Sequence, residues 1–159
     1  FVNKDVIISV KGTQLDIDNV PSVLELVTEG KFYKENDSYY VAYNESEVTG
    51  MEGTTTTLKL DNDAVTLVRT GAINSQFVFK QGQRHLSYYD TDFGSFTISV
   101  FASDVFVNVD DNGGEIKVEY RMEIDNSSTG SNKFHMLIRE AGRSDEFNRE
   151  PKTTDKGYC

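Results

Sequence analysis

The sequence predicts an all-β protein, a single antiparallel up-and-down β-barrel. Apolar residues recur at every second position in most segments, no segment has a helical period, and short turn signals separate the segments. Strands joined by tight turns pair antiparallel, in a barrel or in a two-sheet sandwich. We favour the barrel because closure removes the sheet edges, and 159 residues suit about eight to ten strands.

The first third of the chain alternates apolar and polar residues in three segments. In residues 5–15, Val6, Ile8 and Val10 share one face, which is the two-residue period of a strand. Pro21 breaks the chain, and residues 22–34 alternate again, with Phe32 on the apolar face. A turn follows at 35–38. The apolar face of residues 39–47 then gives way to acidic groups at its end.

The middle of the chain begins with a loop through Gly50 and Gly53 and continues with β-branched strands. Residues 54–60 are rich in threonine, which favours a strand. In residues 64–72, Val65, Leu67 and Arg69 share a face, so the arginine lies in line with apolar neighbours. Further strands are predicted at 75–80, 84–91, 95–102 and 104–110.

The last strands surround the clearest hairpin signal of the chain, Asn112-Gly113, which suits a tight turn with positive φ. A polar turn is predicted at 126–132 and a final strand at 133–139. We therefore expect one barrel domain over residues 1–139 and a polar C-terminal tail over 140–159. Apolar and polar residues alternate throughout residues 115–124. We expect the side chains that point inward to be those of Ile116, Val118, Tyr120, Met122 and Ile124.

Composition disfavours several classes of partner. The chain has 26 acidic and 16 basic residues and a net charge of −10 spread along its length, so we expect no nucleic-acid or anionic-membrane partner. Its one cysteine, Cys159, allows no internal disulfide and predicts a reducing, cytoplasmic location. No apolar run approaches the roughly 20 residues of a membrane-spanning helix.

Three short motifs have a plainer structural explanation than a functional one. Residues 49–54 hold two glycines but neither the lysine nor the helix start of a phosphate-binding loop. Residues 92–94 match a kinase triplet without the other kinase motifs, and we interpret them as a turn. His85 and His135 lie far apart without a companion at metal-ligand spacing. We therefore predict no metal and no cofactor.

One calcium-loop spacing is nearly complete, with only its first position changed. Loops of that type sit between helices, whereas alternating residues predict strands on both sides of this one. We therefore interpret the segment as a hairpin, in which the calcium-type positions would be Asn108, Asp110, Asn112, Gly113 and Glu119.

Several segments together resemble the YwiB-like family of small bacterial proteins, a calycin-type (lipocalin-like) β-barrel group with no assigned function. The resemblance implies the barrel, a cytoplasmic home in a Gram-positive-type bacterium and, by analogy with other calycins, a ligand cavity. No catalytic or binding residue is carried over, and the chain after Arg139 looks unlike the family's usual short ending. The matching segments are Gly12-Thr13-Gln14, 25–30, 49–56, Arg69-Thr70-Gly71, Asn74-Ser75 and 85–89.

A polar constellation around Arg69 is the candidate site. An inward guanidinium needs an acidic partner, because an unpaired buried charge is very costly, and Glu47 is the first choice. A structural ion pair at the barrel end is favoured over an arginine that binds a ligand carboxylate, and both interpretations stay open. The candidate ligand-binding residues are Tyr43, Glu45, Glu47, Glu52, Thr56, Arg69, His85 and Tyr89.

Three functions are compatible with these residues. The first is binding of a small apolar or carboxylate-bearing molecule in the barrel. The second is a protein-interaction module, including a homodimer, which would use outward residues such as Ile7, Phe77, Phe79, Phe101 and Phe106. The third is acid/base catalysis, such as decarboxylation of phenolic acids by analogy with some calycin-type barrels, and it requires Glu47 or Glu52 beside Arg69 and a tyrosine.

Overall fold

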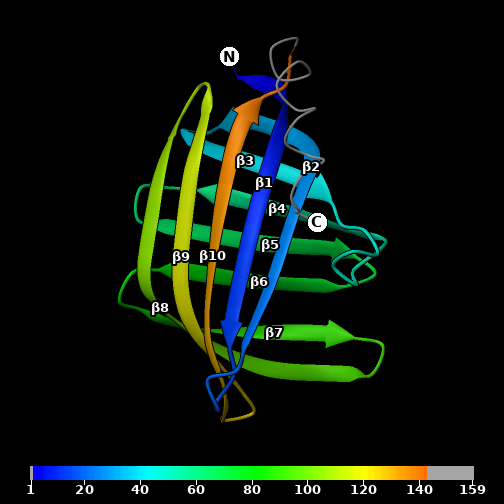
Figure 1. The fold of residues 1–159 in the computed structure, drawn as a ribbon, viewed down its shortest axis with the longest axis vertical. Coiled ribbons are helices and arrows are strands. Elements are labelled where there is room, and N and C mark those ends of the chain that lie inside the picture. The colour runs from blue at the N-terminus through cyan, green and yellow to red at the C-terminus, as the bar shows by residue number, and fades with distance from the viewer. Residues whose placement is uncertain (1, 143–159) are drawn as a thin grey trace.

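The computed structural model describes residues 2–142, which form ten β-strands and no helix (Figure 1). The strands are β1 (Asn3–Leu15), β2 (Pro21–Glu35), β3 (Ser38–Asn44), β4 (Thr54–Leu60), β5 (Ala64–Gly71), β6 (Asn74–Lys80), β7 (Arg84–Thr91), β8 (Gly94–Asp110), β9 (Gly113–Ile124) and β10 (Ser127–Glu140).

The strands close into one antiparallel up-and-down barrel, as predicted. Each strand pairs with its neighbours in the chain, and β1 also pairs with β10 to close the ring. In Figure 1, β1, β2, β9 and β10 run along the length of the molecule, whereas β3 to β7 cross behind them. The barrel therefore consists of two sheet regions that face each other across the interior.

The long strand β8 connects the two regions, and the expectation of two separate strands at 95–102 and 104–110 was wrong. Its register with β9 shifts between Ala102 and Asp104, which marks a β-bulge at Ser103. A bulge inserts one unpaired residue and bends the strand without ending it. The break in alternation at Ser103 was therefore a bend inside one strand.

Two hairpins use two-residue turns in which both central residues have positive φ. These are Asn36-Asp37 (52° and 69°) and Asp125-Asn126 (50° and 70°), and such primed turns match the twist of the paired strands. The predicted polar turn at 126–132 was too long, because β10 already begins at Ser127 and has a bulge between 128 and 131. The Asn112-Gly113 hairpin exists, but Gly113 is already the first residue of β9.

Inward side chains of the strands form one core, and the predicted inward stripe of residues 115–124 is confirmed. Of the expected outward apolar patch, Phe106 is 42% exposed, but Phe77 and Phe79 are buried in the core and Ile7 is only 3% exposed, so the patch does not form as a whole. Phe101 is half-buried, with the guanidinium groups of two arginines near its ring. Core residues include Val6, Ile8, Phe32, Val41, Leu58, Val65, Val100, Ile116, Val118, Met136 and Ile138.

The ladder of the barrel is interrupted in two places. The strand β2 pairs with β1 from Pro21 onward but pairs with β3 only from Lys31. The strand β6 pairs with β7 only at Asn74 and Ser75. The rest of each strand therefore lacks a ladder partner on that side.

The predicted domain boundary and the predicted lack of a membrane-spanning helix can be compared with the structure over residues 2–142. The strand β10 ends at Glu140, one residue past the predicted domain boundary, and residues 143–159 of the predicted tail lie outside the described residues. Over residues 2–142, no helix has the length and apolar character needed to cross a membrane.

Candidate functional site

The barrel interior holds a cavity of about 560 Å³. Side chains from both sheet regions and from the β3–β4 loop line it, and most of them are apolar. All three methionines of the chain are among them, and methionine adapts readily to irregular apolar shapes. The apolar lining includes Val10, Leu24, Leu26, Met51, Leu58, Leu67, Ile98, Met122, Ile124 and Met136.

Aromatic rings form a second part of the lining. The ring centroid of Phe79 lies 4.7 Å from that of Tyr120 and 6.1 Å from that of Phe134, both in inclined geometries. The rings of Phe77 and Tyr89 are 6.3 Å apart. Tilted pairs at these distances are favourable because ring edges meet ring faces, so they give the cavity a well-defined aromatic wall.

Three polar residues of the lining, Tyr43, Arg69 and Tyr89, belong to a row of residues that lie opposite one another on consecutive strands, whereas Thr56 and Ser75 of the same row do not line the cavity. Tyr43 on β3 pairs with Thr56 on β4, which pairs with Arg69 on β5. Arg69 pairs with Ser75 on β6, which pairs with Tyr89 on β7. Directly opposite residues share a face of the sheet, so these five side chains enter the barrel at one level.

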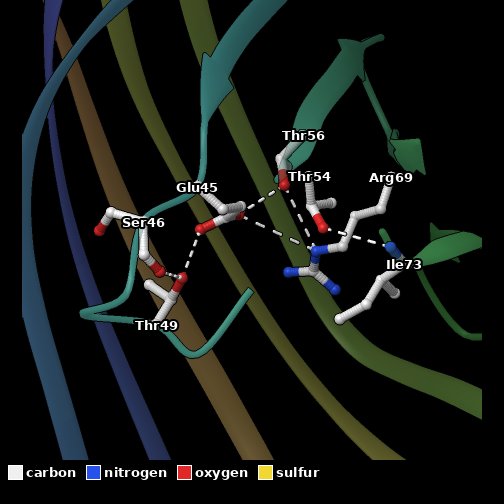
Figure 2. A network of polar contacts seen from close by, with 7 residues as sticks. All are labelled: Glu45, Ser46, Thr49, Thr54, Thr56, Arg69 and Ile73. Carbon is white, nitrogen blue, oxygen red and sulfur yellow. Dashed lines mark hydrogen bonds and ion pairs between the residues drawn. The ribbon is translucent and has the colours of Figure 1, made fainter. Parts of the chain in front are cut away.

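Glu45 organises the centre of this polar group (Figure 2). The Glu45 side chain is 1% exposed, and its carboxylate accepts hydrogen bonds from Thr49 Oγ1 at 2.9 Å and from Thr56 Oγ1 at 2.5 Å. Arg69 Nε lies 3.9 Å from Glu45 Oε2 and donates to Thr56 Oγ1 at 3.3 Å. The buried carboxylate is therefore both paired and hydrogen-bonded, as a buried charge requires.

The end of β3 decides which glutamate faces inward. Glu45 N donates to Thr54 O at 2.8 Å, which extends the pairing with β4 by one residue. The chain then turns, with hydrogen bonds from Thr49 N to the Ser46 carbonyl and from Gly50 N to the Glu47 carbonyl. Glu47 is consequently exposed, and its expected pairing with Arg69 was wrong, because the strand ends before the alternation reaches it.

In Figure 2, dashed lines reach the Nε atom of Arg69 but neither of its two terminal nitrogens. Within residues 2–142, neither nitrogen makes a hydrogen bond or an ion pair. The Arg69 side chain lines the cavity and is 20% exposed. Its Nε edge thus holds it in place, while its outer edge presents the geometry that matches a carboxylate bidentately.

Two tyrosines near Arg69 remain neutral phenols at ordinary pH. Burial raises the pKa of Tyr43, and the Glu45 carboxylate raises that pKa further, while Arg69 opposes the shift. Burial also raises the pKa of Tyr120, again against an opposing effect of Arg69. Each hydroxyl therefore stays protonated and can donate as well as accept a hydrogen bond.

Three more of the predicted residues lie outside the cavity lining. Glu47 and Glu52 are exposed and do not line the cavity. His85 is half-buried on β7, also outside the lining, and its Nε2 atom is buried with no hydrogen-bond partner among residues 2–142. Sequence reasoning missed Thr49 and Met51, since alternation carries no signal for side chains on a loop.

Comparisons with known proteins give a family and a fold. A family model described as "Domain of unknown function (DUF1934)" matches residues 8–136. The "Uncharacterized beta-barrel protein YwiB" of Bacillus subtilis (strain 168) is 24% identical over 110 residues, covering 69% of this chain and 76% of that protein. The crystal structure of ywiB protein from Bacillus subtilis matches with a TM-score of 0.78 at 20% identity, over 88% of this chain and 94% of that one.

Proposed function

The chain belongs to the DUF1934 family of unknown function, and on this premise we propose that its barrel binds an amphipathic small molecule with an acceptor head group, best a carboxylate. One observation carries the proposal. The outer edge of the Arg69 guanidinium has no protein partner in the described chain and faces a largely apolar cavity of about 560 Å³. Small-molecule sites commonly combine such a volume, about 300–1,000 Å³, with a few convergent polar groups.

Each part of the cavity has a role in this proposal. The terminal nitrogens of Arg69 bind the head group, and Tyr43, which lines the same cavity, keeps its phenol protonated and hydrogen-bonded to Glu45. Glu45 and Thr56 position the guanidinium through its Nε edge. The apolar body of the ligand packs against the aromatic wall around Phe79.

The catalytic alternative required Glu47 or Glu52 beside Arg69 and a tyrosine, and the structure does not place either glutamate there. Neither Glu47 nor Glu52 lines the cavity, so neither can serve as its acid or base. Glu45 does line it, but two threonine hydroxyls and Arg69 already engage its carboxylate. We therefore favour binding over catalysis.

We also infer a calycin-type barrel and a cytoplasmic location. The location is supported by the single cysteine of the chain, which can form no internal disulfide.

The test compares lauric acid with lauryl alcohol, which share an apolar body and differ in the head group. Calorimetry should show tighter binding of the acid to the wild-type protein. Arg69→Met should weaken acid binding about 10- to 100-fold, because a hydrogen bond to a charged group contributes about 1.5–3 kcal/mol, and should leave the alcohol nearly unchanged. Glu47→Gln, which changes an exposed glutamate outside the cavity, is the matched control and should bind like wild type.

Two results would contradict the proposal. Equal affinity for acid and alcohol, with no effect of Arg69→Met, would remove Arg69 from recognition. The second is a pair of negative results. Neither probe binds, and native mass spectra of protein purified gently from its host show no bound small molecule. Thermal melting of each variant verifies that it is folded before affinities are compared.

A further inference from the structure

A second, smaller cavity adjoins the one that Arg69 lines. Its volume is about 250 Å³, and it lies where β1 ends and where β2 and β10 begin, so we call it the end chamber. In Figure 1 these strand ends meet at the lower end of the molecule, whereas β5, which carries Arg69, crosses higher up. Four residues line both cavities, so the interior continues from one into the other. They are Gly12, Leu24, Tyr120 and Phe134.

Gly12 leaves space at the junction of the two cavities. It lies on the inward face of β1, two residues after Val10, which lines the larger cavity. Its direct neighbours in the ladder, Leu24 on β2 and Phe134 on β10, both carry large side chains. A Cβ atom at Gly12 would nevertheless meet nothing within 4 Å. The missing side chain therefore keeps the junction open.

A row of neutral polar residues crosses the end chamber. Ser22 on β2 pairs with Gln14 on β1, which pairs with Asn132 on β10. Asn132 also pairs with Tyr120 on β9, and Tyr120 points inward because it lines both cavities. Directly opposite residues share a face of the sheet, so all four side chains face inward. Lys133, the charged residue of the chamber lining, belongs to the outward face, because neighbours along a strand alternate.

Asn132 is the unsatisfied member of this row. Its Nδ2 atom is buried and has no hydrogen-bond partner among residues 2–142. A buried donor without an acceptor is unfavourable, because the group has lost its hydrogen bonds to water. The terminal torsion of an asparagine side chain is broad, so a rotation can turn the amide toward the chamber that Asn132 lines. An acceptor atom placed in the chamber would satisfy this donor.

We propose that the ligand of the barrel carries a second polar group, a hydroxyl or a carbonyl oxygen, which accepts a hydrogen bond from Asn132 in the end chamber. This inference rests on the proposed binding of a carboxylate at Arg69 and extends it to the other end of the ligand. A neutral group fits because the inward polar residues of the chamber carry no charge. The ligand class is therefore a fatty acid that is oxygenated near the end of its chain, such as an ω-hydroxy acid.

The test compares octanoic, decanoic and lauric acid with the ω-hydroxy acid of the same length, by calorimetry on the full chain. At one length or more, the wild-type protein should bind the ω-hydroxy acid about 3- to 10-fold tighter than the plain acid, as for one added hydrogen bond. Asn132→Leu should weaken binding of that ω-hydroxy acid about tenfold or more, because its hydroxyl is then buried without a partner. The plain acid should bind this variant at least as tightly as it binds wild type.

Two further variants separate the hydrogen bond from other effects. Asn108→Leu makes the same chemical change at an exposed position outside both cavities, and it should keep the wild-type preference. Gly12→Val places a side chain at the junction and should abolish the preference while Asn132 stays intact. Thermal melting verifies that each variant is folded. In NMR spectra, the side-chain amide signals of Asn132 should shift with the ω-hydroxy acid and much less with the plain acid.

The inference is overturned if wild type shows no preference at any chain length, or if Asn132→Leu keeps the wild-type preference. It is also overturned if the Asn132 amide signals respond equally to both acids. If Arg69→Met still weakens binding of the acids in these cases, the carboxylate site remains and only the second polar site is lost. If Arg69→Met leaves acid binding unchanged, or no acid binds, the proposed function itself fails and this inference fails with it.

Discussion

At the scale of single residues, the polar end of the cavity depends on one cross-strand row and one chain bend. Thr56 and Arg69 face each other on neighbouring strands, so an arginine in line with Val65 and Leu67 necessarily enters the barrel. That part of the site followed from alternation alone. The choice between Glu45 and Glu47 did not, because it depends on where β3 ends, and the backbone hydrogen bonds of a loop leave no period in the sequence.

We expect Glu45→Gln to destabilise the fold by about 2 kcal/mol. This is less than the roughly 3–5 kcal/mol for breaking a fully buried pair, because the Arg69 side chain retains 20% exposure. Urea unfolding measures the change. The double variant Glu45→Gln/Arg69→Met should recover part of the loss, since it leaves no unpaired guanidinium. Strict additivity of the two single changes would show that the ion pair contributes nothing to stability.

Gly30 marks the point where β2 separates from β3, and we expect Gly30→Ala to destabilise the fold by about 1–3 kcal/mol. A Cβ atom there would lie 2.5 Å from both the Ala42 carbonyl oxygen and Ile8 Cδ1. Gly12→Ala is the matched control, because a Cβ at that position meets nothing within 4 Å. Thermal unfolding of both variants measures the difference, and equal melting temperatures would contradict the close approach at Gly30.

At the scale of elements, alternation located every strand but not its full extent. The strand β8 was divided at Ser103 because a bulge shifts the period by one residue, and a shifted period looks like a strand end. The inward faces of Phe77 and Phe79 were missed although Gln76 and Lys80 occupy the opposite face of β6. The bulge depends on long-range pairing and could not be predicted, whereas the local alternation of β6 was sufficient to predict its inward face.

The bulge in β8 is held by the β6–β7 turn, and we expect Gln81→Ala to cost about 1 kcal/mol of stability. Val105 N donates to the Gln81 side-chain oxygen at 3.0 Å, and Gly82 N donates to the Ala102 carbonyl. Removing the side-chain oxygen leaves the Val105 N–H without its acceptor. Gln81→Glu keeps an acceptor and should retain most of the stability in urea unfolding. Equal loss in both variants would mean that this hydrogen bond does not support the bulge.

At the scale of the whole molecule, the ten strands form a closed barrel, but some neighbouring strands share far fewer ladder pairs than others. The predicted closure is confirmed, and it follows from alternation plus short turns, because an up-and-down chain pairs each strand with its neighbour. The weak places could not be predicted. Closure of β6 onto β7 rests on two register pairs, at Asn74 and Ser75, although both sequences read as ordinary strands. Only the geometry of closing the ring shows where the ladder separates.

This weak seam predicts where the barrel opens first. Beyond Ser75, β6 has no ladder contact with β7, and two buried polar atoms on these strands, Ser75 Oγ and His85 Nε2, have no hydrogen-bond partner in the described chain. Native-state hydrogen exchange in low urea should show the ladder amides that join β6 to β7 at Asn74 and Ser75 exchanging through local opening. Amides of β9, paired along nearly its whole length on both sides, should exchange only on global unfolding. Equal opening free energies for the two sets would show that the seam is as stable as the rest of the barrel, and that it closes through side-chain packing alone.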